Sequence, residues 1–238
     1  MKNSVIFALV VVTTILAGCN KGGSSDSRVK KITSNRGFTT EYTYSAENKI
    51  SSTRNSDGSK TTYTFNGNTV AQQMSDSARG LFITSTMFLN AKGWTDSTRA
   101  SDQSGTYVKA YTHDADGYIT QSRDIVSGRM TDASSSVFKD GNEISATVSD
   151  STSKPLFTVY FDYYTDKPNS LSYANFGMKF LGNDSKNLMK RFVQVLPSGD
   201  TFRVNSFVYH FDDKGRVSQK AMYDRRGALA DSTTITYY

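Results

Sequence analysis

Glycine-containing turn signals recur along this chain at a nearly constant spacing. A polar residue precedes glycine at Gly58, Gly67, Gly80, Gly93, Gly105, Gly117, Gly128 and Gly141, at intervals of 9 to 13 residues. The spacing continues through Lys154-Pro155 and Lys167-Pro168, and it resumes at Gly199, Gly215 and Gly227. Because glycine readily adopts the positive φ angles that tight hairpin turns require, this pattern predicts a long series of hairpins.

The segments between these turns are rich in Thr, Tyr, Phe, Val and Ile, which suit a pleated, half-buried surface. Clear examples are Thr39–Tyr44, Thr61–Phe65 and Phe157–Phe161. Short strands at regular spacing indicate an all-β antiparallel meander, here of about 15 strands with roughly 8–10 residues each. An open sheet this wide tends to curl or split, so we expect residues 29–238 to form a single domain curled into a barrel or a strongly curved sheet.

One segment, residues 172–192, interrupts the regular spacing. It lacks a two-residue period and contains Gly177 and Gly182, so we predict a long irregular insertion with one helical turn near 185–189. Such an insertion is suited to cap one end of a barrel. Long loops often carry function. Phe180 and Asn187 in this insertion, together with the single tryptophan Trp94, are therefore candidates for ligand contact, with packing over apolar surface as the alternative.

The N-terminus has the layout of a secretion signal. Lys2 precedes an apolar run from Val5 to Leu16, and the small residues Ala17 and Gly18 follow. A membrane-spanning helix needs about 20 apolar residues, more than this run supplies. We therefore predict a signal peptide over residues 1–18 rather than a transmembrane or core helix.

The sequence Leu16-Ala17-Gly18-Cys19 resembles a bacterial lipobox, in which signal peptidase recognises the first three residues and cuts before the cysteine. This resemblance implies that Cys19 carries the lipid and that the protein contacts the membrane through it. Residues 19–28 are small and polar, as expected of a flexible tether. Asn20 resembles the residue found after the cysteine in lipoproteins sorted to the outer membrane, which leaves the periplasmic or external side open.

The strand pattern argues against a barrel that spans the bilayer itself. Between Trp94 and Asp102, neither alternating face is apolar, and one face carries Arg99. A spanning strand needs one apolar face about 25 Å tall. Lipid anchoring is therefore the predicted mode of membrane association.

Charge and cysteine content indicate how the domain is stabilised and which partners it can bind. Cys19 is the only cysteine, so the folded domain has no disulfide. The chain carries 28 Lys and Arg against 22 Asp and Glu, and the excess is scattered rather than gathered into a basic stripe. We therefore expect no nucleic-acid partner. An envelope protein or a glycan fits the predicted location better.

No residue pattern indicates catalysis, a metal or a cofactor. His113 and His210 lack metal-ligand spacing, and Ser151 to Lys154 lacks the companion motifs of a Ser-x-x-Lys enzyme. Asp114-Ala-Asp-Gly117 resembles part of a calcium loop, but Arg123 occupies the position that needs a bidentate acid. A hairpin turn explains this segment better. We predict that the protein is not an enzyme, with a hydrolase using scattered acids as the remaining alternative.

The lipobox, the tether, the aromatic hairpins and the stretch Phe180–Leu188 together resemble a Bacteroidetes lipoprotein family of unknown function. The resemblance covers most of the chain after the signal. It implies a cell-envelope lipoprotein with a porin-like fold and supplies no catalytic residues. Two functions follow as hypotheses: a non-catalytic binding or structural module, or a glycan- or small-ligand-binding barrel whose pocket is capped by residues 172–192.

Overall fold

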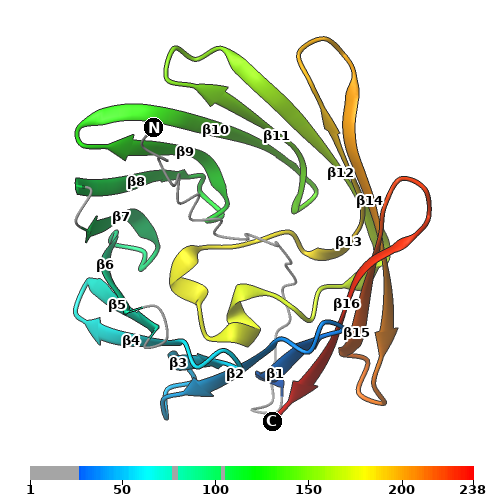
Figure 1. The fold of residues 1–238 in the computed structure, drawn as a ribbon, viewed down its shortest axis with the longest axis horizontal. Helices are drawn as coiled ribbons and strands as arrows, with labels where there is room; N and C mark the ends of the chain where they lie inside the picture. Colours follow the sequence, from blue (N-terminus) through cyan, green and yellow to red (C-terminus); the bar gives the residue numbers. More distant parts are fainter. Residues whose placement is uncertain (1–26, 77–79, 103–104) are drawn as a thin grey trace.

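A computed structural model describes residues 27–76, 80–102 and 105–238 of the chain. The predicted signal peptide, Cys19 and most of the predicted tether lie outside the described residues. Within the described ranges, sixteen antiparallel strands form one closed barrel (Figure 1). Every strand pairs with its neighbours in the chain, and β1 pairs with β16 to close the ring.

The strands follow one another in simple meander order. Their bounds are β1 Val29–Ser34, β2 Thr39–Tyr44, β3 Ile50–Asn55, β4 Lys60–Asn66, β5 Thr69–Asp76, β6 Leu81–Leu89, β7 Thr95–Asp102, β8 Gly105–His113, β9 Ile119–Val126, β10 Arg129–Lys139, β11 Asn142–Asp150, β12 Pro155–Pro168, β13 Asn187–Val195, β14 Thr201–Phe211, β15 Val217–Tyr223 and β16 Leu229–Tyr237. The predicted all-β meander is confirmed, and it closes fully instead of remaining a curved sheet. Closure leaves no unpaired sheet edge.

The hairpin turns explain why glycine recurs so regularly. In the β8–β9 turn, Asp114 Oδ1 accepts hydrogen bonds of 3.0 Å from the N–H groups of both Asp116 and Tyr118, and Gly117 adopts a φ of 89°. Asp114 to Gly117 is thus a hairpin turn, as the sequence indicated. A side-chain oxygen caps the turn in the same way at Asn90, Asp150, Asp212 and Asp224.

The two faces of the barrel wall differ in chemistry. Apolar side chains such as Ile50, Val70 and Phe207 are buried inside. Arginines from separate strands are exposed on the outer face, namely Arg54, Arg99, Arg123 and Arg191. Apolar residues such as Val137 and Tyr160 are also exposed there, so the outer face is mixed, whereas an outer-membrane barrel carries an apolar outer band.

The long β12–β13 connection, residues 169–186, folds into the barrel and is called the plug below (Figure 1). It contains two short 3₁₀ helices, η2 (Tyr173–Phe176) and η3 (Lys179–Leu181). Each ends at a glycine with positive φ, Gly177 at 66° and Gly182 at 98°, which stops the helix from continuing. Neither helix has the length and apolar character to cross a bilayer.

The predicted insertion was placed a few residues too late. Residues 187–192 belong to β13, so the helical turn expected near 185–189 is wrong. Leu188 is fully buried and Met189 nearly so, and the strand pairs with both β12 and β14. Burial between two neighbouring strands overrides the weak local helical signal of this segment.

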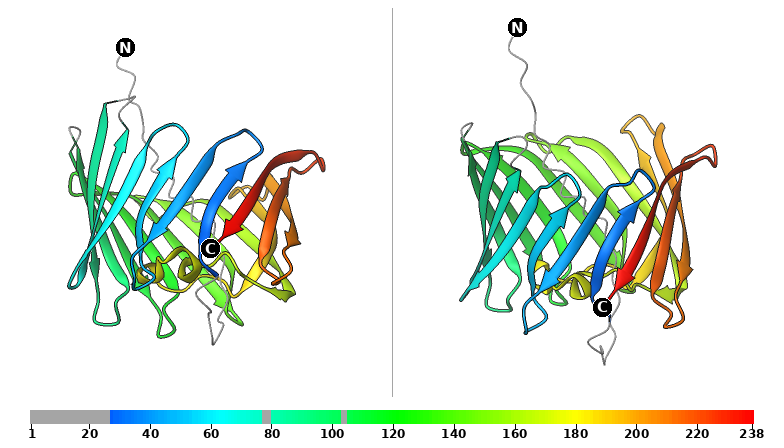
Figure 2. Two further views of the ribbon diagram at one scale, coloured as in Figure 1. Left: turned by 90° about the horizontal axis from the view of Figure 1, so that it is seen from below. Right: turned by 60° about the horizontal axis from the view of Figure 1, so that its bottom comes forward.

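The plug closes one end of the barrel, at the rim that also holds the C-terminus (Figure 2). Hydrogen bonds join it to strands and turns far apart in the chain. These are Ile50 N–H to Gly177 O, Asn183 N–H to Gly117 O, Lys186 N–H to Gly141 O and Val217 N–H to Ser170 Oγ, at 2.8 to 3.1 Å. The predicted role of this insertion as an end cap is thus seen in the structure.

Candidate functional site

A cavity of about 440 Å³ lies between the plug and the lumen face of β8–β15. A sixteen-stranded barrel is too wide for wall side chains alone to fill. The plug packs toward the opposite wall, where Phe180 joins a buried cluster with Ile50, Val70 and Met87. The space left on the β8–β15 side is the cavity.

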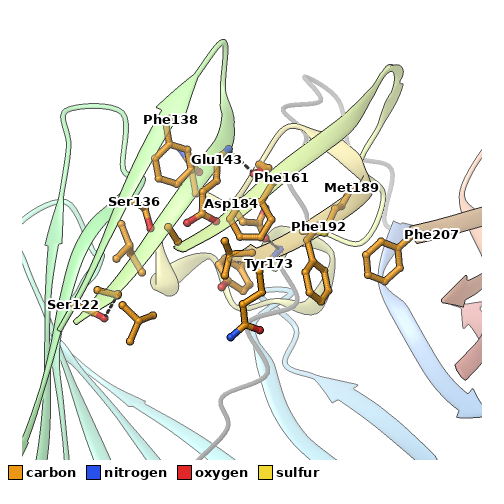
Figure 3. Close-up of a pocket in the computed structure, with 18 of the residues that line it drawn as sticks. Ser122, Ser136, Phe138, Glu143, Phe161, Tyr173, Asp184, Met189, Phe192 and Phe207 are labelled. Carbon is orange, nitrogen blue, oxygen red and sulfur yellow. Dashed lines mark hydrogen bonds between the residues drawn. The ribbon is translucent and has the colours of Figure 1, made fainter. Parts of the chain in front are cut away.

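Aromatic and aliphatic side chains form most of the cavity wall. Phe138, Phe161, Phe192 and Phe207 come from four different strands and surround it (Figure 3). Val148 and Val159 fill positions between them. This wall suits the apolar body of a ligand, because each Å² of apolar surface removed from water contributes about 25 cal/mol of favourable free energy.

The floor of the cavity is polar and is made where the plug meets β11. Ser185 Oγ accepts the N–H of Glu143 at 2.9 Å and lies 2.8 Å from the hydroxyl oxygen of Tyr163. Asp184 Oδ2 accepts the N–H of Tyr173 at 2.9 Å. Burial raises the pKa of Glu143, and a hydrogen bond from Ser136 partly opposes this shift. The Asp184 carboxylate therefore holds the plug together, whereas Glu143 contacts the plug through its backbone N–H and its carboxyl group is hydrogen-bonded by Ser136 on β10.

Three cationic side chains line the same cavity from different strands. Lys109 on β8 forms an ion pair of 3.3 Å with Asp124. Arg203 on β14 and Lys220 on β15 lie over aromatic rings, with Arg203 Cζ 5.3 Å from the centroid of Phe192 and Lys220 Nζ 4.8 Å from that of Phe207. Burial lowers the pKa of Lys220 to about 8, and Asp231 partly opposes the shift.

The three side chains that the sequence suggested for ligand contact do not line this cavity. Phe180 is buried against Phe65, with ring centroids 5.5 Å apart. Asn187 is buried and hydrogen-bonded to Asn142 and to the carbonyls of Thr165 and Lys167. Both side chains thus hold the plug and β13 in place.

Trp94 lies instead at the rim, beside a second and more open hollow. Its ring centroid is 5.6 Å from that of His113 and 4.7 Å from Lys92 Nζ. Both ring nitrogens of His113 are buried without a hydrogen bond of good geometry. Burial lowers the pKa of His113, while the nearby Leu181 backbone and the carboxylates of Asp96 and Asp114 oppose the shift. His210, in contrast, is exposed on β14.

Sequence reasoning missed the residues that do line the cavity. Glu143 and Asp184 are far apart in the chain and line one cavity because the plug is hydrogen-bonded to the start of β11 and its turn, through Lys186 N–H to Gly141 O and Glu143 N–H to Ser185 Oγ. Lys220 gave no local signal, because its inward direction follows from strand register. Within the part of the chain that the structure describes, no three His, Cys, Asp or Glu residues gather as a metal site.

Comparisons with known proteins match this architecture. The fold is similar to that of a porin-like protein from Bacteroides uniformis, with a TM-score of 0.66 and 14% identity over 91% of this chain and 99% of that one. It is also similar to a porin-like protein from Bacteroides vulgatus, with a TM-score of 0.62 and 14% identity over 89% of this chain and 99% of that one. No protein-family model and no curated protein sequence matches the chain. The chain therefore has a porin-like barrel fold.

Proposed function

We propose that this protein is a lipid-anchored barrel of the bacterial cell envelope that binds a small ligand in its lumen and catalyses no reaction. One observation carries the proposal: an apolar-walled cavity of about 440 Å³ lies inside a barrel whose outer face carries exposed arginines. Ligand sites in proteins commonly measure about 300–1,000 Å³ and combine apolar walls with a few polar groups.

The exposed arginines on the outer face of the wall support a barrel that stands in water. Arg99 and Arg123 are exposed on neighbouring strands, and an arginine facing lipid at the bilayer midplane costs about 2–4 kcal/mol. A lipid on Cys19 supplies membrane attachment without requiring the strands to face lipid. Two or more acyl chains anchor a protein stably, whereas one chain is marginal.

The location and lineage belong to the same proposal. The lipobox-like residues Leu16 to Cys19 support export and lipidation, and Asn20 supports the outer membrane. The fold shared with two porin-like proteins of Bacteroides is the fold expected of the Bacteroidetes lipoprotein family that the sequence resembles. The aromatic wall favours a ligand with an apolar body over a glycan, which needs many more polar partners.

Binding of a neutral apolar fluorophore, N-phenyl-1-naphthylamine, tests the proposal. The protein is the chain from residue 19 onward with Cys19→Ala, which keeps it in water. Ala146 lines the cavity, whereas Ser145 is its neighbour on the outer side of β11. We expect saturable binding that Ala146→Trp weakens by at least about 10-fold, because the indole projects into the cavity and takes up space that the probe needs. Ser145→Trp is the matched control and should bind like the parent protein. Lack of saturable binding, or equal binding by both variants, contradicts a lumen site.

A further inference from the structure

The cavity holds a cationic group, Lys220, that has no ion-pair partner among the residues that the structure describes. Lys220 lies opposite Tyr209 in the β14–β15 register and directs its side chain into the lumen cavity. Its ammonium lies 4.8 Å from the ring centroid of Phe207. Among the described residues, no carboxylate is within ion-pair distance of this ammonium, and Asp231 on β16 acts on it only from farther away.

Lys109, the other lysine that lines the cavity, does have an ion-pair partner. Its ammonium lies 3.3 Å from Asp124 Oδ2, and the hydroxyl of Tyr107 donates to the other oxygen of the same carboxylate. A buried charge is unfavourable unless it is paired and hydrogen-bonded. Lys109 meets that condition within the protein. Lys220 finds no such partner in the described part of the chain, and a bound molecule with a negative group would supply one.

Arg203 extends the cationic character along the same wall. Its Nε–H donates a 2.7 Å hydrogen bond to Asn205 Oδ1, and its guanidinium lies over Phe192. The rings of Phe192 and Phe207 are 6.1 Å apart. Arg203, the two rings and Lys220 therefore form a row with a cation at each end and apolar surface between.

From this geometry we infer that the lumen ligand is an amphipathic anion, whose negative group is bound by Lys220 and whose apolar body lies on Phe207 and Phe192. The inference rests on the proposed function and specifies its ligand class. A cationic ligand fits less well, since Asp184 accepts the N–H of Tyr173 and Glu143 is held by Ser136. The negative group contributes specificity, and the rings contribute the contact area.

A pair of probes that share one ring system tests this inference. N-phenyl-1-naphthylamine is neutral, and 1-anilinonaphthalene-8-sulfonate adds one sulfonate to the same skeleton. We expect the Cys19→Ala protein to bind the anionic probe at least about 10-fold more tightly, because hydrogen bonds to charged groups are roughly twice as strong as neutral ones. Lys220→Met should abolish this preference while retaining the neutral probe.

Control variants distinguish binding of the anionic probe at Lys220 from its general electrostatic attraction to a basic protein. Lys60→Met removes an exposed charge from the outer face of β4 and should leave both affinities unchanged. Lys220→Arg keeps the charge and should retain most of the preference for the anion. If Lys220→Met does not fold, Lys220→Gln provides the same comparison with a polar side chain. Ala146→Trp should weaken the binding of both probes.

The outcomes distinguish a failure of the inferred ligand class from a failure of the proposed function. If the parent protein binds both probes with equal affinity, or if the neutral variants of Lys220 keep the preference, the ligand class is wrong and the lumen site stands. If the neutral probe does not bind saturably, or if Ala146→Trp has no effect on either probe, the proposed function fails and the ligand class fails with it.

Discussion

The N–H of Asn183 in the plug donates a 2.8 Å hydrogen bond to the carbonyl oxygen of Gly117 in the β8–β9 turn. Residues 118 and 183 also form an isolated parallel bridge, which is unusual in a barrel whose strands are all antiparallel. The plug is thus joined to the rim by backbone contacts, and those contacts need a glycine at position 182, where a β-carbon would meet Gly117 O.

Gly182→Ala should destabilise the protein by disturbing this junction. A β-carbon at Gly182 would lie 2.5 Å from Gly117 O and 3.0 Å from His113 Nε2, and the φ of 98° disfavours any other residue. We expect the free energy of unfolding to fall by about 1–3 kcal/mol from backbone strain, with steric displacement adding to the loss. Urea denaturation measures the change. Gly199→Ala is the matched control, because Gly199 has a φ of 89° and open space around its β-carbon position. An equal loss in both variants contradicts a steric role for the junction.

Thr95→Val should remove a single buried hydrogen bond between the wall and the plug. Thr95 is 1% exposed, and its hydroxyl donates to the carbonyl of Phe180 at 2.9 Å. Valine has nearly the same shape, so the loss should reflect the unpaired carbonyl, about 1–3 kcal/mol in the free energy of unfolding. Thr84→Val, at an exposed position on β6, should change stability much less. Denaturant titration of both variants and the parent protein measures these changes. Equal stability of Thr95→Val and the parent contradicts a stabilising role for this hydrogen bond.

Acidification should destabilise the protein through His113. Its pKa is lowered in the folded state by burial, so below about pH 6.5 the unfolded chain takes up a proton more readily than the folded one. The free energy of unfolding should therefore fall as the pH falls through this range. His113→Phe should show a shallower dependence between pH 7 and 5, measured by denaturation at several pH values. Glu143, whose raised pKa acts in the opposite direction, is present in both proteins and cancels in the comparison. Identical slopes argue against a buried neutral His113.

Binding of the anionic probe should weaken as the pH rises through about 8, where Lys220 loses its proton. An ordinary lysine, with a pKa near 10.4, stays charged over this range. Burial raises the pKa of the neighbouring Tyr209, so this phenol stays neutral. Fluorescence titrations from pH 7 to pH 9.5 should show this loss for the sulfonate and not for the neutral probe. Lys220→Arg should show no such loss, because arginine remains charged. A persistent loss in that variant points to another titrating group.

Cys19→Ala in the full-length chain should release the protein from the membrane fraction of the cells that produce it. The lipid on this cysteine is the proposed means of attachment, and no other cysteine can replace it. Fractionation followed by immunoblotting measures the change, with Ser24→Ala in the predicted tether as the control. Unchanged membrane association of Cys19→Ala would show that the barrel binds the membrane by itself.

The hairpin turns were predictable because their chemistry is local. Asp114 and Gly117 form their turn with bonds to residues at most four positions away, so the sequence pattern is sufficient to recognise it. The antiparallel order of the strands, their approximate number (about 15 expected, sixteen observed) and the presence of one large insertion follow from the same spacing. The exact start of β13 could not be predicted from this spacing, because Asn187 and Leu188 are held by distant strands.

The inward or outward direction of side chains could not be predicted by alternation alone. Simple alternation places Thr95 on the same face as Arg99. In the structure the pairing shifts between Phe88 and Leu89, so Thr95 points inward toward the plug while Arg99 stays exposed outside. A single extra residue at a bulge reverses the face of everything beyond it.

By itself, then, the sequence determined an all-β meander with its turns and one irregular insertion, because turn chemistry and strand propensity act over a few residues. Only the tertiary structure decided that β1 pairs with β16, that the plug packs toward Ile50 and Val70, and that a cavity remains on the other side. These features depend on contacts between residues far apart in the chain. The same contacts bring Lys220, Phe207 and Arg203 to one wall, which no local pattern encodes.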